Sequence, residues 1–207
     1  MFNIKYKGSY VSDEQMIKTK KIPKEAIQFG IVKSLNREFA IGFLMLLPLM
    51  MILFITTYIK VKDIAYHLTM NIEIIISFFI VLGLIYVLTF VHEFIHACFY
   101  PLKAEKEIYK SKSLGAYFVY SEEMITKRRY IVMVLAPMFL LGIIPYIIWL
   151  LLPQMIPMPF YLIIPITCWF MTIMSMGDVA NVYHVLKEVP NKAKLFNHGL
   201  LDSYYIK

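Results

Sequence analysis

The 207-residue sequence has little of what a disulfide-bonded or multidomain protein needs. It contains only two cysteines, Cys98 and Cys168, and both lie inside apolar runs, which favours ordinary burial over a disulfide framework. No internal repeat, low-complexity tract or flexible linker divides the chain. No early apolar segment is followed by a small-residue cleavage site, so we expect no cleavable signal peptide. One membrane domain is the simplest organisation.

Charged residues are scarce for a chain of this size, and apolar residues dominate. Hydrophobic residues make up 59% of the chain and the mean hydropathy is +0.64. This is more apolar surface than one soluble core needs, so the composition predicts an integral membrane protein. The net charge of +7 comes from basic residues in the loops and flanks of apolar segments, where anionic lipid attracts them. We therefore expect the lipid bilayer, and no nucleic acid, as a partner.

Four apolar stretches are long enough to cross a bilayer. They predict an all-α integral membrane protein with four transmembrane helices, at about residues 39–59, 72–100, 131–152 and 160–186. The expected organisation is a basic N-terminal segment, a membrane domain and a C-terminal tail, over residues 1–38, 39–186 and 187–207. Residues 108–120 are rich in Tyr, Phe, Val and Ser around Gly115, which indicates a short β-hairpin in the loop between the second and third helices.

The basic residues also predict an orientation. From the N-terminus onwards, the segments outside the four spans contain 8, 2, 7, 0 and 4 Lys or Arg residues. Because loops rich in Lys and Arg stay in the cytoplasm, this alternation predicts a multi-pass protein of the cell membrane with both termini cytoplasmic. Apolar residues at positions 27, 31, 35 and 39 are compatible with an amphipathic helix along the membrane surface, and a solvated tail is the alternative.

A metal-binding motif lies at the end of the second apolar stretch. His92-Glu93-Phe94-Ile95-His96 places two imidazoles one helical turn apart with a carboxylate beside them, which is typical of a catalytic zinc site. Ionisable side chains are costly inside a membrane and usually have a function there. We therefore predict that His92 and His96 bind Zn²⁺ and that Glu93 is the catalytic base.

A hydrolytic zinc site usually has three protein ligands and one water, so a third ligand is needed. Asp178 is the only acidic residue of the fourth apolar stretch, and its depth matches: Ile72 to His92 spans roughly 30 Å and Phe160 to Asp178 roughly 27 Å at helical rise. His184 is the competing candidate. Asn181, one turn after Asp178, is a candidate to orient that carboxylate or a substrate carbonyl, although solvation is the more common fate of such a residue.

The predicted hairpin suggests how a substrate would bind. A transmembrane helix hides its peptide bonds behind its own hydrogen bonds, so a substrate must be extended before cleavage. A strand formed by Gly115, Ala116, Tyr117 and Phe118 could add such a segment to a sheet edge. The alternative is an ordinary cytoplasmic loop with some strand content.

The chain resembles the putative zincin peptidases, a family of small bacterial membrane proteins, from about residue 70 to the C-terminus. More distantly it is similar to site-2 proteases, which cleave transmembrane segments. The resemblance implies zinc, the two histidines and Asp178 as ligands, and Glu93 as base. Site-2 proteases usually carry an Asp-Gly pair, whereas here the glycine precedes the aspartate. The resemblance rests on His92-Glu93-x-x-His96, the basic segment Ser121 to Tyr130 before Ala136-Pro137, and Gly177-Asp178 followed by Asn181.

Three classes of function remain open at this point. The first is a zinc metalloprotease acting near the cytoplasmic face on transmembrane or hydrophobic peptides. The second is a non-catalytic zinc-binding membrane scaffold or regulator. A transporter is disfavoured, because the interiors of the first and third spans are nearly free of charge. The sequence does not specify the substrate or the oligomeric state.

Overall fold

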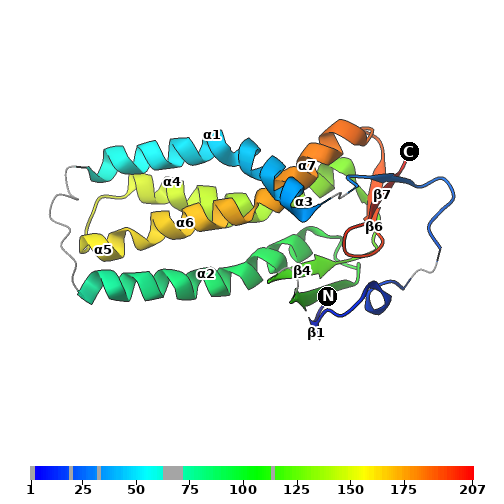
Figure 1. The fold of residues 1–207 in the computed structure, drawn as a ribbon, viewed down its shortest axis with the longest axis horizontal. Helices are drawn as coiled ribbons and strands as arrows, with labels where there is room; N and C mark the ends of the chain where they lie inside the picture. The colour runs from blue at the N-terminus through cyan, green and yellow to red at the C-terminus, as the bar shows by residue number, and fades with distance from the viewer. Residues whose placement is uncertain (1–2, 19–20, 32–33, 63–71, 113–114) are drawn as a thin grey trace.

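The computed structural model describes residues 3–18, 21–31, 34–62, 72–112 and 115–207. Long helices run along one axis, and small sheets cover one end of them, where both termini lie (Figure 1). The predicted loop between the first two spans falls mainly at residues 63–71, which lie outside the described residues. The structure is mostly helical, as the apolar composition predicts.

Three helical segments are long and apolar enough to cross a membrane: α1 (Leu35–Val61), α2 (Ile72–Phe99) and the segment Lys127–Leu151. Only 17% of the apolar window of α1 and 11% of that of α2 is buried inside the protein. Their remaining apolar surface needs a lipid environment, because water solvates it poorly. These helices confirm the prediction of a membrane protein.

The third segment contains two irregularities. It consists of α3 (Lys127–Pro137), a π-helix (η3, Met138–Ile143) and α4 (Ile144–Leu151). Pro137 has no N–H and cannot bond to the carbonyl of Met133 four residues earlier. That carbonyl therefore remains available to another donor.

The predicted fourth span is broken rather than continuous. It comprises α5 (Met158–Tyr161), α6 (Ile163–Met174) and α7 (Met176–Glu188), with a bend of 42° between Met158–Met174 and α7. The structure therefore has three candidate spans, or four if this bent pair counts as one. At the break, Ser175 donates its hydroxyl to the carbonyl of Met171 at 3.2 Å, an interaction that often bends helices. The break places Asp178 in the first turn of α7.

Two small sheets show that an all-α description is too simple. One has the order β1-β3-β4, with β1 (Ile4–Ser9) parallel to β3 (Lys106–Ser111) and β3 antiparallel to β4 (Ala116–Tyr120). The other is antiparallel, in the order β2-β7-β6-β5. Its strands are β2 (Ile27–Phe29), β5 (Ile125–Thr126), β6 (Lys194–Asn197) and β7 (Ser203–Ile206).

The segment before the first span is also not an amphipathic helix. Residues Ile27–Phe29 form β2 and pair with β7, and Gly30 follows with φ +60°. A positive φ ends regular structure and is readily adopted by glycine. Helix α1 then begins at Leu35, where the Ser34 hydroxyl accepts a hydrogen bond from the Arg37 N–H at 3.2 Å.

Helices α1 and α7 approach each other closely at Gly42. A Cβ atom at this position would lie 1.8 Å from the carbonyl oxygen of Met176, the first residue of α7. The obstacle is backbone and cannot rotate away. We expect Gly42→Ala to lower the free energy of unfolding in detergent by about 2 kcal/mol, since overpacking costs roughly 1–3 kcal/mol.

Gly83→Ala is the matched control for this experiment. Gly83 lies within α2, and a Cβ there would meet no atom within 4 Å. Alanine is also the better helix former, so this variant should be as stable as the wild type or slightly more stable. Equal unfolding midpoints for Gly42→Ala and Gly83→Ala would show that the close approach of α1 and α7 does not contribute to the stability of the fold.

Ion pairs join Lys5 of β1, and Lys18 further along the chain, to Glu105, the residue before β3. Lys5 Nζ donates to Glu105 Oε1 at 2.9 Å, and Lys18 Nζ lies 2.8 Å from Glu105 Oε2. The hydrogen bonds from Lys18 and Lys5 lower the pKa of Glu105 to about 2 from its ordinary value of 4.5. A carboxyl group whose pKa falls on folding stabilises the fold above its unfolded pKa, and this contribution is lost as the pH falls through the folded value.

We therefore expect β1 to loosen as the pH falls from about 4.5 to about 2. Hydrogen exchange of the β1 amides, corrected for the intrinsic effect of pH, should rise over this range. In Glu105→Gln the β1 amides should already exchange faster at neutral pH and respond less to acid. Unchanged protection of β1 in the wild type at pH 2 would contradict this role of Glu105.

Candidate metal centre

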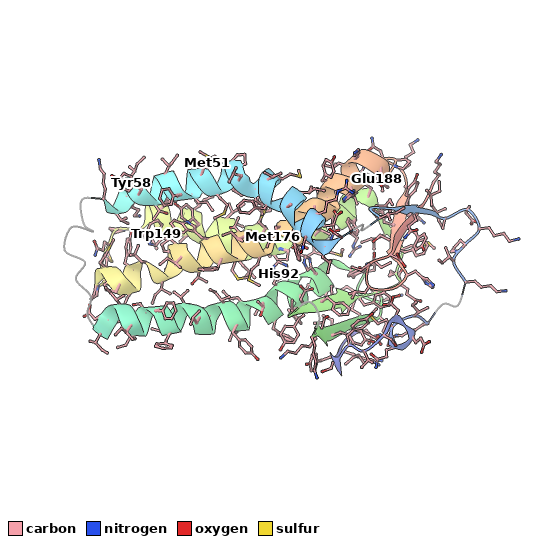
Figure 2. All side chains as sticks on the ribbon, in the orientation of Figure 1. Met51, Tyr58, His92, Trp149, Met176 and Glu188 are labelled. Atoms are coloured by element: carbon pink, nitrogen blue, oxygen red, sulfur yellow. The ribbon has the colours of Figure 1, made fainter. Side chains whose placement is uncertain are left out.

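The two histidines of the motif lie near the C-terminal end of α2. They are separated by one helical turn, and each is 6% exposed. Their ring centroids are 4.8 Å apart. Figure 2 shows His92 at the level of Met176, the first residue of α7. The histidines therefore face the break in the fourth apolar segment.

Asp178 reaches both histidines from the first turn of α7. Its Oδ2 lies 3.0 Å from His92 Nε2, and its Oδ1 lies 3.4 Å from His96 Nε2. One ligand atom from each of these three residues lies within 4.8 Å of the others. The first turn of a helix also favours a negative charge, because its backbone N–H groups point toward it. The structure thus brings together the three residues that the sequence predicts as ligands.

The carbonyl of Met133 orients His96. His96 Nδ1 lies 2.9 Å from this oxygen, which is the one that Pro137 leaves without a helical partner. A carbonyl can only accept, so Nδ1 carries a hydrogen, and Nε2 is the nitrogen that faces Asp178 and could hold a metal ion. Backbone carbonyls commonly fix metal-binding histidines in this way. The role of Met133 was not predicted from the sequence, although the position of Pro137 four residues later was the available signal.

The donor set fits a zinc ion. Two imidazole nitrogens and a carboxylate oxygen are the ligands of many catalytic zinc sites, which keep a further position for water. His92 Nδ1 is buried, and among the described residues it has no hydrogen-bond partner. The other nitrogen of this ring, Nε2, is the one that faces Asp178. Both histidines thus direct their Nε2 atoms toward the Asp178 carboxylate.

Glu93 is held beside this cluster by a strand. Its Oε2 accepts a hydrogen bond from the backbone N–H of Val119 on β4 at 3.1 Å. Glu93 does not belong to the group of three ligands, but it lines the same cavity as His96 and Asp178. The hydrogen bond to β4 was not predicted, because residue spacing on a helix does not reveal which strand packs against it.

The cavity has a volume of about 270 Å³ and lies where α1, α2, α3, α7 and the strands meet. Its lining is mixed, with apolar side chains around acidic groups and histidines. Among the described residues, it contains no Lys or Arg. The lining includes Glu38, Phe39, Glu93, His96, Phe118, Val119, Asp178, Asn181 and His184.

Two basic residues at the start of α3 hold the ends of the helices that carry the histidines and Asp178. Arg129 donates from Nε to the carbonyl of Phe99, the last residue of α2, at 2.6 Å. Lys127 donates from Nζ to the carbonyl of Val189, just after α7, at 2.5 Å. Cations stabilise helix C-termini because the last carbonyls lack helical partners. The basic first turn of α3 therefore holds the ends of α2 and α7 close to each other.

The remaining predicted residues lie nearby but outside the cluster. His184 is bonded to Glu38 and Glu188 rather than to the group of three, so the structure does not support it as the third ligand. Asn181 is exposed and lines the cavity, and the hydrogen bonds of the described residues include none between it and Asp178. Gly115 precedes β4 with φ +65°, and Ala116, Tyr117 and Phe118 begin that strand.

Two buried histidines and an aspartate within reach of one another, with a glutamate beside them, are typical of zinc-dependent metallopeptidases. The profile of a family described as "Putative zincin peptidase" matches residues 85–194, more than half of the chain and the part that contains all four residues. The chain therefore belongs to this family. The comparisons with curated proteins and with solved structures found no significant match to the chain.

Proposed function

We propose that this chain is a zinc-dependent membrane metalloprotease that hydrolyses extended apolar segments at the cytoplasmic face of the membrane. The observation that carries the proposal is the position of Glu93, which lines one cavity with His96 and Asp178. A zinc scaffold needs the ligands but has no need of a base in the same cavity. Membership of the family supports a peptidase, and the candidate spans support a membrane protein.

His92, His96 and Asp178 would hold the zinc, and the Met133 carbonyl keeps His96 in the required tautomer. When bound, zinc supplies a water of lowered pKa and polarises the carbonyl of the scissile peptide bond. Asp178 also places a negative charge beside the two neutral imidazoles. The chain thereby provides a charge-compensated site in an apolar setting.

Glu93 moves the proton. Because its Oε2 accepts the Val119 N–H, its Oε1 is available to take a proton from water as the oxygen bonds to the peptide carbon. As the peptide C–N bond breaks, Glu93 returns this proton to the leaving amine. The hydrogen bond from β4 also fixes the carboxylate, so that it meets the reacting atoms in one orientation.

Strand β4 is suited to binding an extended substrate. Among the described strands it pairs with β3 on one side only, and the Val119 N–H points away from β3 toward Glu93. A peptide added along this edge would receive backbone hydrogen bonds and pass beside Glu93. In this proposal, residues Gly115 to Phe118 hold the part of the substrate that precedes the site.

The proposed orientation follows from the basic residues. The loop between α2 and α3 and both terminal segments contain most of the Lys and Arg residues. The two histidines lie in the part of α2 that leads into this loop. The positive-inside rule then places the site and both termini on the cytoplasmic side.

The test is hydrolysis by purified protein with bound zinc, using apolar single-span peptides in detergent micelles and mass spectrometry of the products. We expect internal cleavage that stops when phenanthroline removes the metal and returns when zinc is restored. If the zinc-loaded wild type forms no more product than the zinc-loaded Glu93→Gln variant, the protease proposal fails and the zinc-binding scaffold is favoured.

A further inference from the structure

A second group of titratable residues lies at the edge of the same cavity, outside the predicted zinc site. His184 on α7 is placed between two carboxylates, with Nε2 2.7 Å from Glu38 Oε2 and Nδ1 2.8 Å from Glu188 Oε1. The second oxygen of Glu188 accepts a hydrogen bond from the Gly30 N–H at 2.9 Å. The second oxygen of Glu38 has no such donor. Glu38 Oε1 is buried and unpartnered among the described residues.

Glu38 differs from Glu188 in where it lies. It is in the first turn of α1, is only 8% exposed and lines the cavity together with Glu93 and Asp178. Glu188 is at the end of α7, and its side chain is 36% exposed and not part of the described lining. The close approach of α1 and α7 at Gly42 keeps Glu38 against the helix that carries Asp178.

In the part of the chain that the structure describes, no donor reaches the second oxygen of Glu38. The His184 ring meets Glu38 with one nitrogen and Glu188 with the other, so it can offer Glu38 at most one hydrogen bond. A buried carboxylate oxygen without a donor is costly, and a cation is the partner that removes this cost most fully. No Lys or Arg of the described lining supplies one.

We propose that Glu38 Oε1 binds a cationic group of the substrate, either a Lys or Arg side chain or a free α-amino group. This inference rests on the proposed protease function and adds its specificity. The substrate would then carry a positive charge at a fixed distance from the scissile bond. Leu35 and Phe39 flank Glu38 on α1 and line the cavity. In this proposal they contact the apolar stem of the substrate's Lys or Arg side chain.

The test measures peptide binding rather than cleavage, so that it does not depend on activity. The protein is zinc-loaded Glu93→Gln in detergent, and the probes are extended apolar peptides in which one lysine is moved along the chain, each paired with its norleucine counterpart. At one position we expect the lysine peptide to bind about tenfold more tightly, as is typical for a charge-assisted hydrogen bond. Acetylation of the amino terminus shows whether the α-amino group binds instead.

Variants then assign the preference to one carboxylate. Adding Glu38→Gln should abolish it, because the amide is uncharged, and when its oxygen stays paired with His184 its NH2 group takes the place of Oε1. Glu38→Asp should retain part of the preference. Adding Glu188→Gln is the matched control, because it also removes a carboxylate partner of His184 but should leave the preference intact.

Two results would overturn the inference. Equal binding of every lysine and norleucine pair, with acetylation without effect, would show that no cation is recognised. A preference that survives Glu38→Gln but is lost in Glu188→Gln would place recognition elsewhere. Cleavage of the same peptides by the wild type tests the protease proposal separately, so either proposal can fail alone.

Discussion

Replacing Glu93 by glutamine is expected to lower the rate of peptide hydrolysis by about a thousandfold while zinc remains bound, since general acid–base catalysis contributes roughly 10²–10⁴-fold. The glutamine amide cannot take a proton from water at neutral pH. Its carbonyl oxygen can still accept the Val119 N–H, so β4 should keep its place. The measurement is kcat/KM on one apolar peptide, with zinc content determined on the same preparation.

Glu73→Gln provides the matched control. Glu73 lies in the first turn of the same helix α2, at the opposite end from the motif. It should therefore have the hydrolysis rate and zinc content of the wild type. A Glu93→Gln protein that retains more than about a tenth of the wild-type rate would exclude Glu93 as the base.

The second large effect is expected from Asp178→Asn. The neutral amide is a weaker ligand than the carboxylate that lies 3.0 Å from His92 Nε2 and 3.4 Å from His96 Nε2. Loss of residues that merely orient ligands costs 10–100-fold in metal affinity, so loss of a ligand should cost at least about a hundredfold. Competition with a chromophoric zinc chelator measures this change.

His184→Gln is the informative comparison, because the sequence leaves His184 as the competing candidate for the third zinc ligand. Its ring is bonded to Glu38 and Glu188, so this variant should bind zinc as tightly as the wild type. The opposite result, with affinity kept in Asp178→Asn and lost in His184→Gln, would require a different metal site.

The sequence predicts the helices and the three clustered residues for clear physical reasons. Apolar runs of bilayer length leave few alternatives to a helix, and residues at equal depth on neighbouring helices can meet. Asp178 could therefore be paired with His92 and His96 before the structure was known. The break at Ser175 was not predicted, because it depends on a hydroxyl bond within the helix rather than on hydropathy.

The sheet formed by β2, β5, β6 and β7 was not predicted from the sequence. Strand β2 has three residues and pairs with β7, which lies at the other end of the chain. Apolar residues at four-residue spacing were compatible with a helix or with a solvated tail there, but the segment instead pairs with a distant strand, and Gly30 follows it at φ +60°. Short strands stabilised by distant partners leave little local pattern. The position of Glu38 beside the cavity is a consequence of the same tertiary packing and could not be predicted either.

The most direct test of the zinc site is X-ray absorption at the zinc edge on wild-type protein purified in the presence of zinc. The ligand set predicts nitrogen and oxygen neighbours only, with two imidazoles at about 2.0–2.1 Å. Cys98 and Cys168, the two free cysteines, should not contribute a sulfur neighbour. A zinc–sulfur distance, a spectrum without imidazole scattering, or protein that retains no zinc would contradict a site built from His92, His96 and Asp178.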